Sequence, residues 1–242
     1  AIGECVSSGI RHIIFWSLPI TALFVVLRAH IVRVILGSGA FSWSDTRITA
    51  AALALFVISV VFQNIQLFLT RAHYAFGKTR LPLFINLGNA ILTVILAFVF
   101  SLYFSPEGTF FSNISRLLKV DGLVRVAVLG LPIAFSIGAT FSAILLWRFL
   151  EKEIKHSSIK PILICFRDSL LNALLIGATT SFALRFFDDV FSLDYAFGVF
   201  MQAFISGMIG IAVGVAFLLI IRNMELKEIL DSMKSKFKKI PN

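Results

Sequence analysis

Six long apolar runs constrain what this chain can fold into more than any other feature. An α-helix needs about 20 mostly apolar residues to cross the ~30 Å hydrocarbon core of a membrane. The runs 48–70 and 195–221 contain no charged residue at all. Because a lipid interior offers the backbone no hydrogen bonds, runs of this length are expected to be helical. We therefore predict an all-α polytopic transmembrane helix bundle with six spans, at about residues 11–36, 46–70, 81–105, 123–148, 162–186 and 195–221.

The composition is also that of a membrane protein. Of the 242 residues, 58% are hydrophobic and 14% are charged, whereas soluble domains are about 45–50% apolar and about a quarter charged. The net charge of +9 comes from Lys and Arg at the ends of the apolar runs, and not from a basic stripe of the kind that binds nucleic acid. We expect residues 1–222 to form the transmembrane bundle and residues 223–242 to form a basic amphipathic tail, with no nucleic-acid partner.

The distribution of Lys and Arg predicts how the spans are oriented. Short loops that carry Lys and Arg are retained in the cytoplasm. With six spans both chain ends fall on one side, and that side receives 15 of the 22 basic residues. Both ends of the chain are therefore predicted to be cytoplasmic, together with the basic turn at residues 71–80 between the second and third spans.

Local signals predict where some helices begin, end or bend. Ser42 and Asp45 have the spacing of a capping box, which would begin the second span. Gly77 can take the left-handed conformation that ends a helix, and Pro82 suits the first turn of the next one. Pro132 lies inside the expected fourth span and predicts a kink there, because it removes a backbone hydrogen bond.

Four polar side chains inside the spans are candidate substrate or cavity residues. Gln63 and Asn64 lie near the expected cytoplasmic end of the second span, and Asn89 and Thr93 lie four residues apart on one face of the third. Polar groups in lipid are costly, so each needs a partner. These side chains can line a cavity that holds a polar substrate or a cation, or they can bond to neighbouring helices. The sequence leaves both interpretations open.

Two arginines, Arg28 and Arg33, lie towards the expected outer end of the first span. A guanidinium at this depth can reach the headgroup phosphates by extending along the helix. It can also face an anionic substrate in a cavity, because its planar donors suit phosphate. Both residues are candidate substrate or cavity residues.

Small residues gather in the last two spans. Gly207, Gly210 and Gly214 lie in the sixth span, and Gly177 lies in the fifth. Small residues four apart let two helices approach closely in a membrane. These glycines therefore indicate either a packing seam between helices or a groove shaped for a lipid tail.

Patterns typical of catalytic or metal sites are missing from the sequence. It contains no nucleophile elbow, no zinc-protease motif and no phosphate-binding loop. Cys5 and Cys165 are far apart and belong to no CxxC or Cys/His cluster. We expect no enzyme activity, no catalytic residue, no metal and no cofactor.

Three segments resemble consecutive parts of a known family. They are residues 27–56, residues 71–87 and residues 130–150, and the most specific part is the pattern R-x-x-Y-A-x-G-x-T-R-x-P from Arg71 to Pro82. In this respect the chain resembles the lipid II flippases (MurJ/MviN) of the multidrug/oligosaccharidyl-lipid/polysaccharide exporter superfamily. Members of that family have fourteen transmembrane helices in two lobes, and the resemblance implies that this chain is the C-terminal six-helix portion.

The resemblance implies a function in cell-wall biogenesis and cell shape. Such flippases move an undecaprenyl-linked peptidoglycan precursor across the bacterial cytoplasmic (inner) membrane by alternating access. Their substrate arginines lie mainly on helices before this chain begins, so none can be carried over. The last two helices form a groove for the lipid tail, which here implies residues 169–184 and 195–221, with Gly177, Gly207, Gly210 and Gly214 as candidates.

Several alternatives remain open from the sequence. The substrate can be another lipid-linked precursor or a drug of the same superfamily, or the chain can be a membrane scaffold whose basic tail recruits a partner or anionic lipid. The chain lacks an initiator Met, so we expect a fragment or a short member of the family. Its partners would be the lipid substrate, membrane lipids and a missing N-terminal lobe, in the same chain or in another protein.

Overall fold

Helices make up almost all of the part of the chain that the structure describes. The computed structural model describes residues 2–37, 42–103, 126–154, 159–190 and 195–228. The elements are α1 (Ile2–Leu36), α2 (Trp43–Ala75), α3 (Arg80–Tyr103), the short 3₁₀-helix η1 (Val126–Leu129), α5 (Gly130–Glu151), α6 (Ile159–Phe186) and α7 (Ala196–Ile220). In these residues six helices are long and apolar enough to cross a membrane. The predicted all-α fold with six candidate spans is thereby confirmed.

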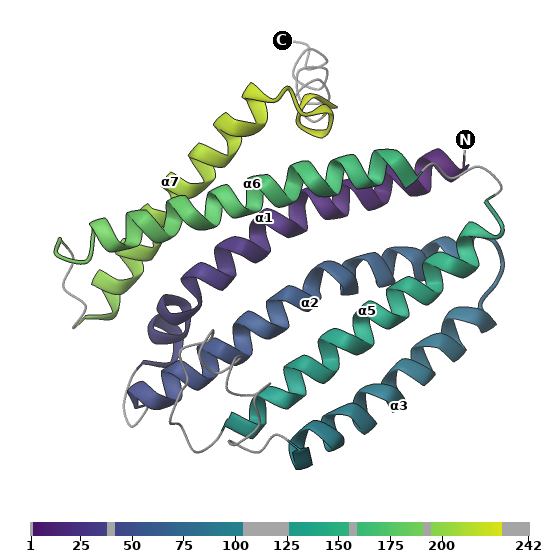
Figure 1. The fold of residues 1–242 in the computed structure, drawn as a ribbon, viewed down its shortest axis with the longest axis horizontal. Helices are drawn as coiled ribbons and strands as arrows, with labels where there is room; N and C mark the ends of the chain where they lie inside the picture. Colours follow the sequence, from purple (N-terminus) through teal and green to yellow (C-terminus); the bar gives the residue numbers. More distant parts are fainter. Residues whose placement is uncertain (1, 38–41, 104–125, 155–158, 191–194, 229–242) are drawn as a thin grey trace, which may run out of the picture.

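The helices form an open row in which α1 joins two groups (Figure 1). On one side α1 packs against α2, α2 packs against α5, and α5 packs against α3. On the other side α1 packs against α6 and α7, which also pack against each other. In this arrangement α3 lies at the edge of the row, and its most apolar stretch contains no buried residue. Apolar side chains on such a face suit contact with lipid or with another part of a membrane protein.

The helices run roughly side by side, so the bundle has two ends along the helix axes, which we call the hairpin end and the far end. The hairpin end carries the α2–α3 turn at residues 76–79 and the residues 221–228 that follow α7. The far end carries the last turn of α1 and residues 187–190 after α6. Of the predicted tail at residues 223–242, residues 224–228 are helical, and residues 229–242 lie outside the described part of the chain.

The helix boundaries follow from local chemistry. At the start of α2, the Ser42 hydroxyl accepts a hydrogen bond from the Asp45 backbone N–H at 3.2 Å, and the Ser42 N–H donates to the Asp45 carboxylate at 3.1 Å. This reciprocal pair is the predicted capping box. After α2, Gly77 has a φ of 73°, a conformation that costs glycine little because it has no Cβ.

Pro132 does not lie where the sequence placed it relative to its helix. The helix α5 begins at Gly130, so Pro132 is in its first turn. The N–H groups of a first turn have no partner within the helix, so a proline there removes nothing. The expected mid-span kink at Pro132 is therefore wrong, because the preceding residues 126–129 form η1 instead of the first turn of a longer α-helix.

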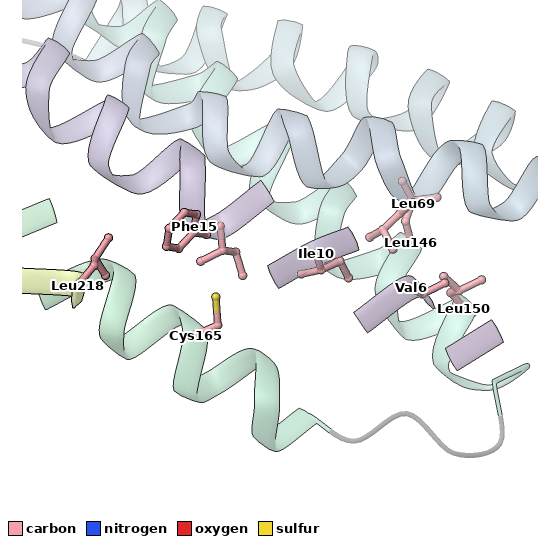
Figure 2. Packing of buried hydrophobic residues seen from close by; sticks show 9 residues of the cluster. Val6, Ile10, Phe15, Leu69, Leu146, Leu150, Cys165 and Leu218 are labelled. Atoms are coloured by element: carbon pink, nitrogen blue, oxygen red, sulfur yellow. The ribbon is translucent and has the colours of Figure 1, made fainter. Parts of the chain in front are cut away.

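The main hydrophobic core lies towards the hairpin end and joins five helices (Figure 2). It contains buried side chains of α1, α2, α5, α6 and α7: Val6, Ile10, Ile14, Phe15, Leu69, Leu146, Leu150, Cys165 and Leu218. The first turns of α1, before the predicted span at residues 11–36, take part in this core through Val6 and Ile10. Burying each side chain stabilises the fold by about 1.5–3 kcal/mol in water, and in a membrane close packing takes over that role.

Candidate functional site

An apolar groove runs between α1 and α7. Towards the far end it is a cavity of about 320 Å³. The cavity is lined by apolar side chains of both helices and by one histidine: Leu27, His30, Ile31, Val34, Ile35, Phe200, Ala203 and Phe204. A cavity with such a lining suits an apolar ligand, because water in it would find few hydrogen-bonding partners.

A second cavity, of about 200 Å³, continues along the same two helices towards the hairpin end. It is lined by side chains of α1, α6 and α7 and of the segment after α7: Phe15, Trp16, Pro19, Ile20, Leu23, Asn172, Ile176, Ile211, Val215, Leu218 and Leu226. Leu23 and Leu27 are one helical turn apart, so the two cavities follow each other along α1. We call the two cavities together the α1–α7 groove.

Gly207 faces α1 between the two cavities. A Cβ added to Gly207 would be 3.5 Å from Leu27 Cδ1 and 3.8 Å from Leu23 Cδ1, which are ordinary contact distances. The glycine therefore packs against Leu23 and Leu27 of α1, which line the two cavities, and it lines neither cavity itself.

The other three candidate glycines lie in contacts between helices. A Cβ added to Gly210 would collide with Thr180 Oγ1 of α6, and one added to Gly214 would lie 2.5 Å from Ile176 Cδ1. Gly177 of α6 faces Val26 of α1. Gly210 and Gly214 let α6 and α7 approach closely, as small residues do in membranes. None of the three lines the α1–α7 groove.

Oxygen atoms of α6 face the glycines of α7. Thr180 Oγ1 and Asn172 Oδ1 are buried without a hydrogen-bond partner in the described residues, and they lie against Gly210 and Gly214. A glycine Cα–H can act as a weak donor at a helix interface. The same arrangement recurs between α3 and α5, where Asn89 and Thr93 face Gly138.

A polar cluster borders the groove at the far end. Gln202 of α7 is completely buried, and its Nε2 donates to Leu184 O at 3.0 Å and to Asp188 Oδ1 at 2.7 Å. The Gln202 amide lies close to the imidazole of His30, and it also holds the Asp188 carboxylate. Since His30 also lines the groove, the cluster connects three helices to the far cavity.

The candidate arginines lie on the far half of α1. Arg28 and Arg33 are both half-buried. The Arg33 guanidinium lies over the Trp43 ring of α2, 5.1 Å from its centroid. Such a cation–π contact fixes the side chain at the start of α2. Neither arginine lines the α1–α7 groove.

The candidate amides of α2 make contacts between and within helices. Gln63 Nε2 donates to Ser59 Oγ of its own helix at 2.7 Å. Asn64 Nδ2 donates to Ser17 Oγ of α1 at 3.4 Å. A neighbouring amide, Gln66, donates to Asn86 Oδ1 of α3 at 2.9 Å. The bonds of Asn64 and Gln66 join α2 to α1 and to α3, which is a common use of amides in membranes.

The structure does not bring the six polar candidates into one site. Arg28 and Arg33 are at the far half of α1, Gln63 and Asn64 are near α1 and within α2, and Asn89 and Thr93 are at the contact of α3 with α5. Among the described residues no hydrogen bond or ion pair joins these three pairs.

Sequence reasoning missed the α1–α7 groove and the His30–Gln202–Asp188 cluster. The family resemblance implied a lipid-tail groove on the last two helices, whereas this groove lies between α1 and α7. One sequence signal for this contact was available. Gln202, Ser206, Gly210 and Gly214 are spaced four residues apart, so the sixth span has one face made of polar and small residues. The helix that this face meets could not be read from the sequence.

Comparisons with known proteins agree on one family. The family described as "Lipid II flippase MurJ" matches residues 1–204. The lipid II flippase MurJ of Thermosipho africanus (strain TCF52B) is 24% identical over 123 residues, which cover 51% of this chain and 25% of that protein. The matched part of the chain thus spans about a quarter of the curated relative. No solved structure matches the chain.

Proposed function

The chain belongs to the lipid II flippase MurJ family, and on that premise we propose that it forms part of a flippase for lipid-linked peptidoglycan precursor. In this role it would act in a bacterial cytoplasmic membrane, with the hairpin end facing the cytoplasm. The excess of Lys and Arg at that end supports the orientation. A further lobe, in the same chain or in a partner, would complete the central cavity.

The observation that carries this proposal is the α1–α7 groove. A long polyprenyl tail is entirely apolar, and so is nearly all of the lining of the two cavities. Because the cavities follow each other along two membrane helices, a tail could stay in contact with apolar side chains while its headgroup changes sides. We assign the lipid tail to this groove, with Gly207 facing α1 between its two cavities and with Gly177, Gly210 and Gly214 shaping the helix contacts beside it.

The headgroup is assigned mainly to the rest of the flippase. Asn64, Asn89 and Thr93 face neighbouring helices, which supports a role in holding the helices together. Gln63 bonds within its own helix. Arg28 and Arg33 remain our candidates for phosphate, either of the substrate or of membrane lipid, because guanidinium groups bind phosphate well.

Two tryptophan variants test the groove in the full-length protein. Val215 lines the cavity nearer the hairpin end and is partly exposed, so Val215→Trp fills the groove without overpacking a buried site. Ala216 is the next residue, is exposed, and does not line the groove, so Ala216→Trp is a matched control.

The measurement is the exposure of lipid II to an outside reagent in cells depleted of their own flippase. We expect Val215→Trp to lower this exposure at least several-fold and Ala216→Trp to leave it near the unsubstituted level, at equal amounts of protein in the membrane. If depletion of the full-length protein leaves lipid II equally exposed, the flippase proposal is wrong. If both tryptophan variants behave alike, the groove assignment is wrong.

A further inference from the structure

The segment that follows α7 bounds the α1–α7 groove at the hairpin end. Leu226 of this segment lines the cavity nearer that end, together with Phe15 and Trp16 of α1 and Leu218 of α7. We call residues 221–228 the strap. A lipid tail in the groove could not extend into the space that the Leu226 side chain fills.

The strap turns one face towards the bundle. The Glu225 side chain is buried and pairs with Arg11 of α1. Leu226 is partly buried and packs against the main hydrophobic core. Met224, by contrast, is 72% exposed. The closed position of the strap therefore depends on the contacts of two neighbouring side chains, one charged and one apolar.

The turn that begins the strap is unfavourable for the residue that occupies it. Arg222 has a φ of 51°. Its N–H donates to Leu219 O at 3.2 Å, and the Asn223 N–H donates to Leu218 O at 3.1 Å, which is the Schellman pattern at the end of a helix. Glycine usually occupies this position, because the left-handed conformation brings a Cβ too close to the following carbonyl oxygen. Strain of this kind persists only where other contacts hold it.

The closed strap carries a second cost at its ion pair. Arg11 Nε is buried and has no hydrogen-bond partner within the described residues, and the Glu225 carboxylate is withdrawn from water. Opening the strap would relax Arg222 and hydrate both charges, whereas closing it buries Leu226. From these opposed contributions we propose that the strap is a gate, which swings about Arg222 and whose Leu226 side chain blocks the hairpin end of the groove.

The gate has a consequence for the lipid tail, which rests on the proposed flippase function. The tail and Leu226 compete for the same apolar surface at the hairpin end of the groove. A tail that reaches this end binds only to the open strap, so it shifts the population towards that state. The contact of Leu226 with the groove is in this sense autoinhibitory. The opening of the strap itself does not depend on that function.

The test measures the distance between the strap and the α2–α3 turn. Spin labels are placed at Lys227 and Thr79, which are both exposed, in full-length protein whose exposed native cysteines are replaced. Distances are recorded in lipid nanodiscs without any polyprenyl lipid. Leu226→Ala removes the side chain that lies in the groove. Met224→Ala is the matched control, because it shortens an apolar side chain of the same strap that is 72% exposed.

We expect Leu226→Ala to raise the fraction of long distances at least several-fold and Met224→Ala to leave the distribution unchanged. Adding Arg222→Gly to Leu226→Ala should lower that fraction again, because glycine removes the strain of the closed turn. The proposal would be overturned if Leu226→Ala has the same distribution as the labelled protein without it. It would also be overturned if Arg222→Gly changes nothing in the Leu226→Ala background.

A second measurement needs no further substitution in the labelled protein. Undecaprenyl phosphate added to the nanodiscs should raise the fraction of long distances, because its tail takes the place of Leu226. The competition is wrong if this lipid leaves the distances unchanged while Val215→Trp still lowers the exposure of lipid II, and the proposed function then stands. The comparison of Leu226→Ala with Met224→Ala contains no substrate, so its outcome is independent of transport.

Discussion

The side chains of Arg11 and Glu225 form an ion pair that ties the start of α1 to the segment after α7. Arg11 Nη1 and Glu225 Oε1 are 3.2 Å apart, and the glutamate side chain is only 5% exposed. The Asn223 side chain accepts hydrogen bonds from the backbone N–H groups of Glu225 and Leu226, which fixes the direction of this segment. The pair therefore holds the two ends of the described chain together at the hairpin end.

Breaking this pair on one side should destabilise the protein strongly. Arg11→Met leaves a buried carboxylate without its partner, which costs about 3 kcal/mol. Arg11→Met combined with Glu225→Leu removes both charges and should recover most of that loss. The measurement is thermal unfolding of the purified full-length protein. Arg167→Met is the control, because the Arg167 side chain is 68% exposed and its pair with the neighbouring Asp168 is worth less than about 1 kcal/mol. Equal losses in both single variants would contradict the prediction.

A methyl group at Gly210 should separate α6 from α7. The added Cβ would collide with Thr180 Oγ1 and lie 3.2 Å from Ile176 O, which is backbone and cannot rotate away. Overpacking of this kind costs about 1–3 kcal/mol. Gly88→Ala in α3 is the matched control, because a Cβ there meets nothing within 4 Å. We expect Gly210→Ala to lower the melting temperature and Gly88→Ala to keep or raise it, since alanine favours helix by up to about 1 kcal/mol.

Replacing Gly77 by alanine should destabilise the protein more than replacing it by asparagine. Gly77 has a φ of 73°, and a Cβ there would meet no neighbouring atom. Any loss of stability therefore comes from the backbone conformation, which costs an ordinary L-residue about 1–2 kcal/mol. Asparagine tolerates this conformation better. Gly77→Ala should unfold at a lower temperature than Gly77→Asn, and the opposite order would show that the turn relaxes.

The orientation of the bundle can be tested with single cysteines. Thr79 lies in the α2–α3 turn and Asp189 lies after α6, and both are exposed. In cells, Thr79→Cys should resist a membrane-impermeant thiol reagent and Asp189→Cys should react. The background carries Cys5→Ser, because Cys5 is exposed and Cys165 is buried. Permeabilised cells provide the control in which both positions react. If only position 79 is labelled in intact cells, the orientation is the opposite of the one proposed.

Much of the fold could be predicted because its signals are local. The capping box of Ser42 and Asp45, the left-handed Gly77 and the first-turn Pro82 lie within a few residues of the boundary that each sets. Pro132 was misread since nothing nearby shows that η1 replaces the first turns of a longer helix. The candidate site was harder to predict, because its parts come from α1, α6 and α7, and a single sequence does not reveal which helix faces meet.

The sequence by itself determined that this is an all-α membrane protein of six candidate spans, because lipid leaves a long apolar run no other way to satisfy its backbone. Its motifs also indicated the family. Only the tertiary structure decided that α1 lies between two groups of helices, that the apolar groove follows α1 and α7, and that His30 meets Gln202. Membrane helices are apolar on nearly every face, so hydrophobicity alone does not select their partners. Close packing at glycines and a few buried polar contacts make that selection.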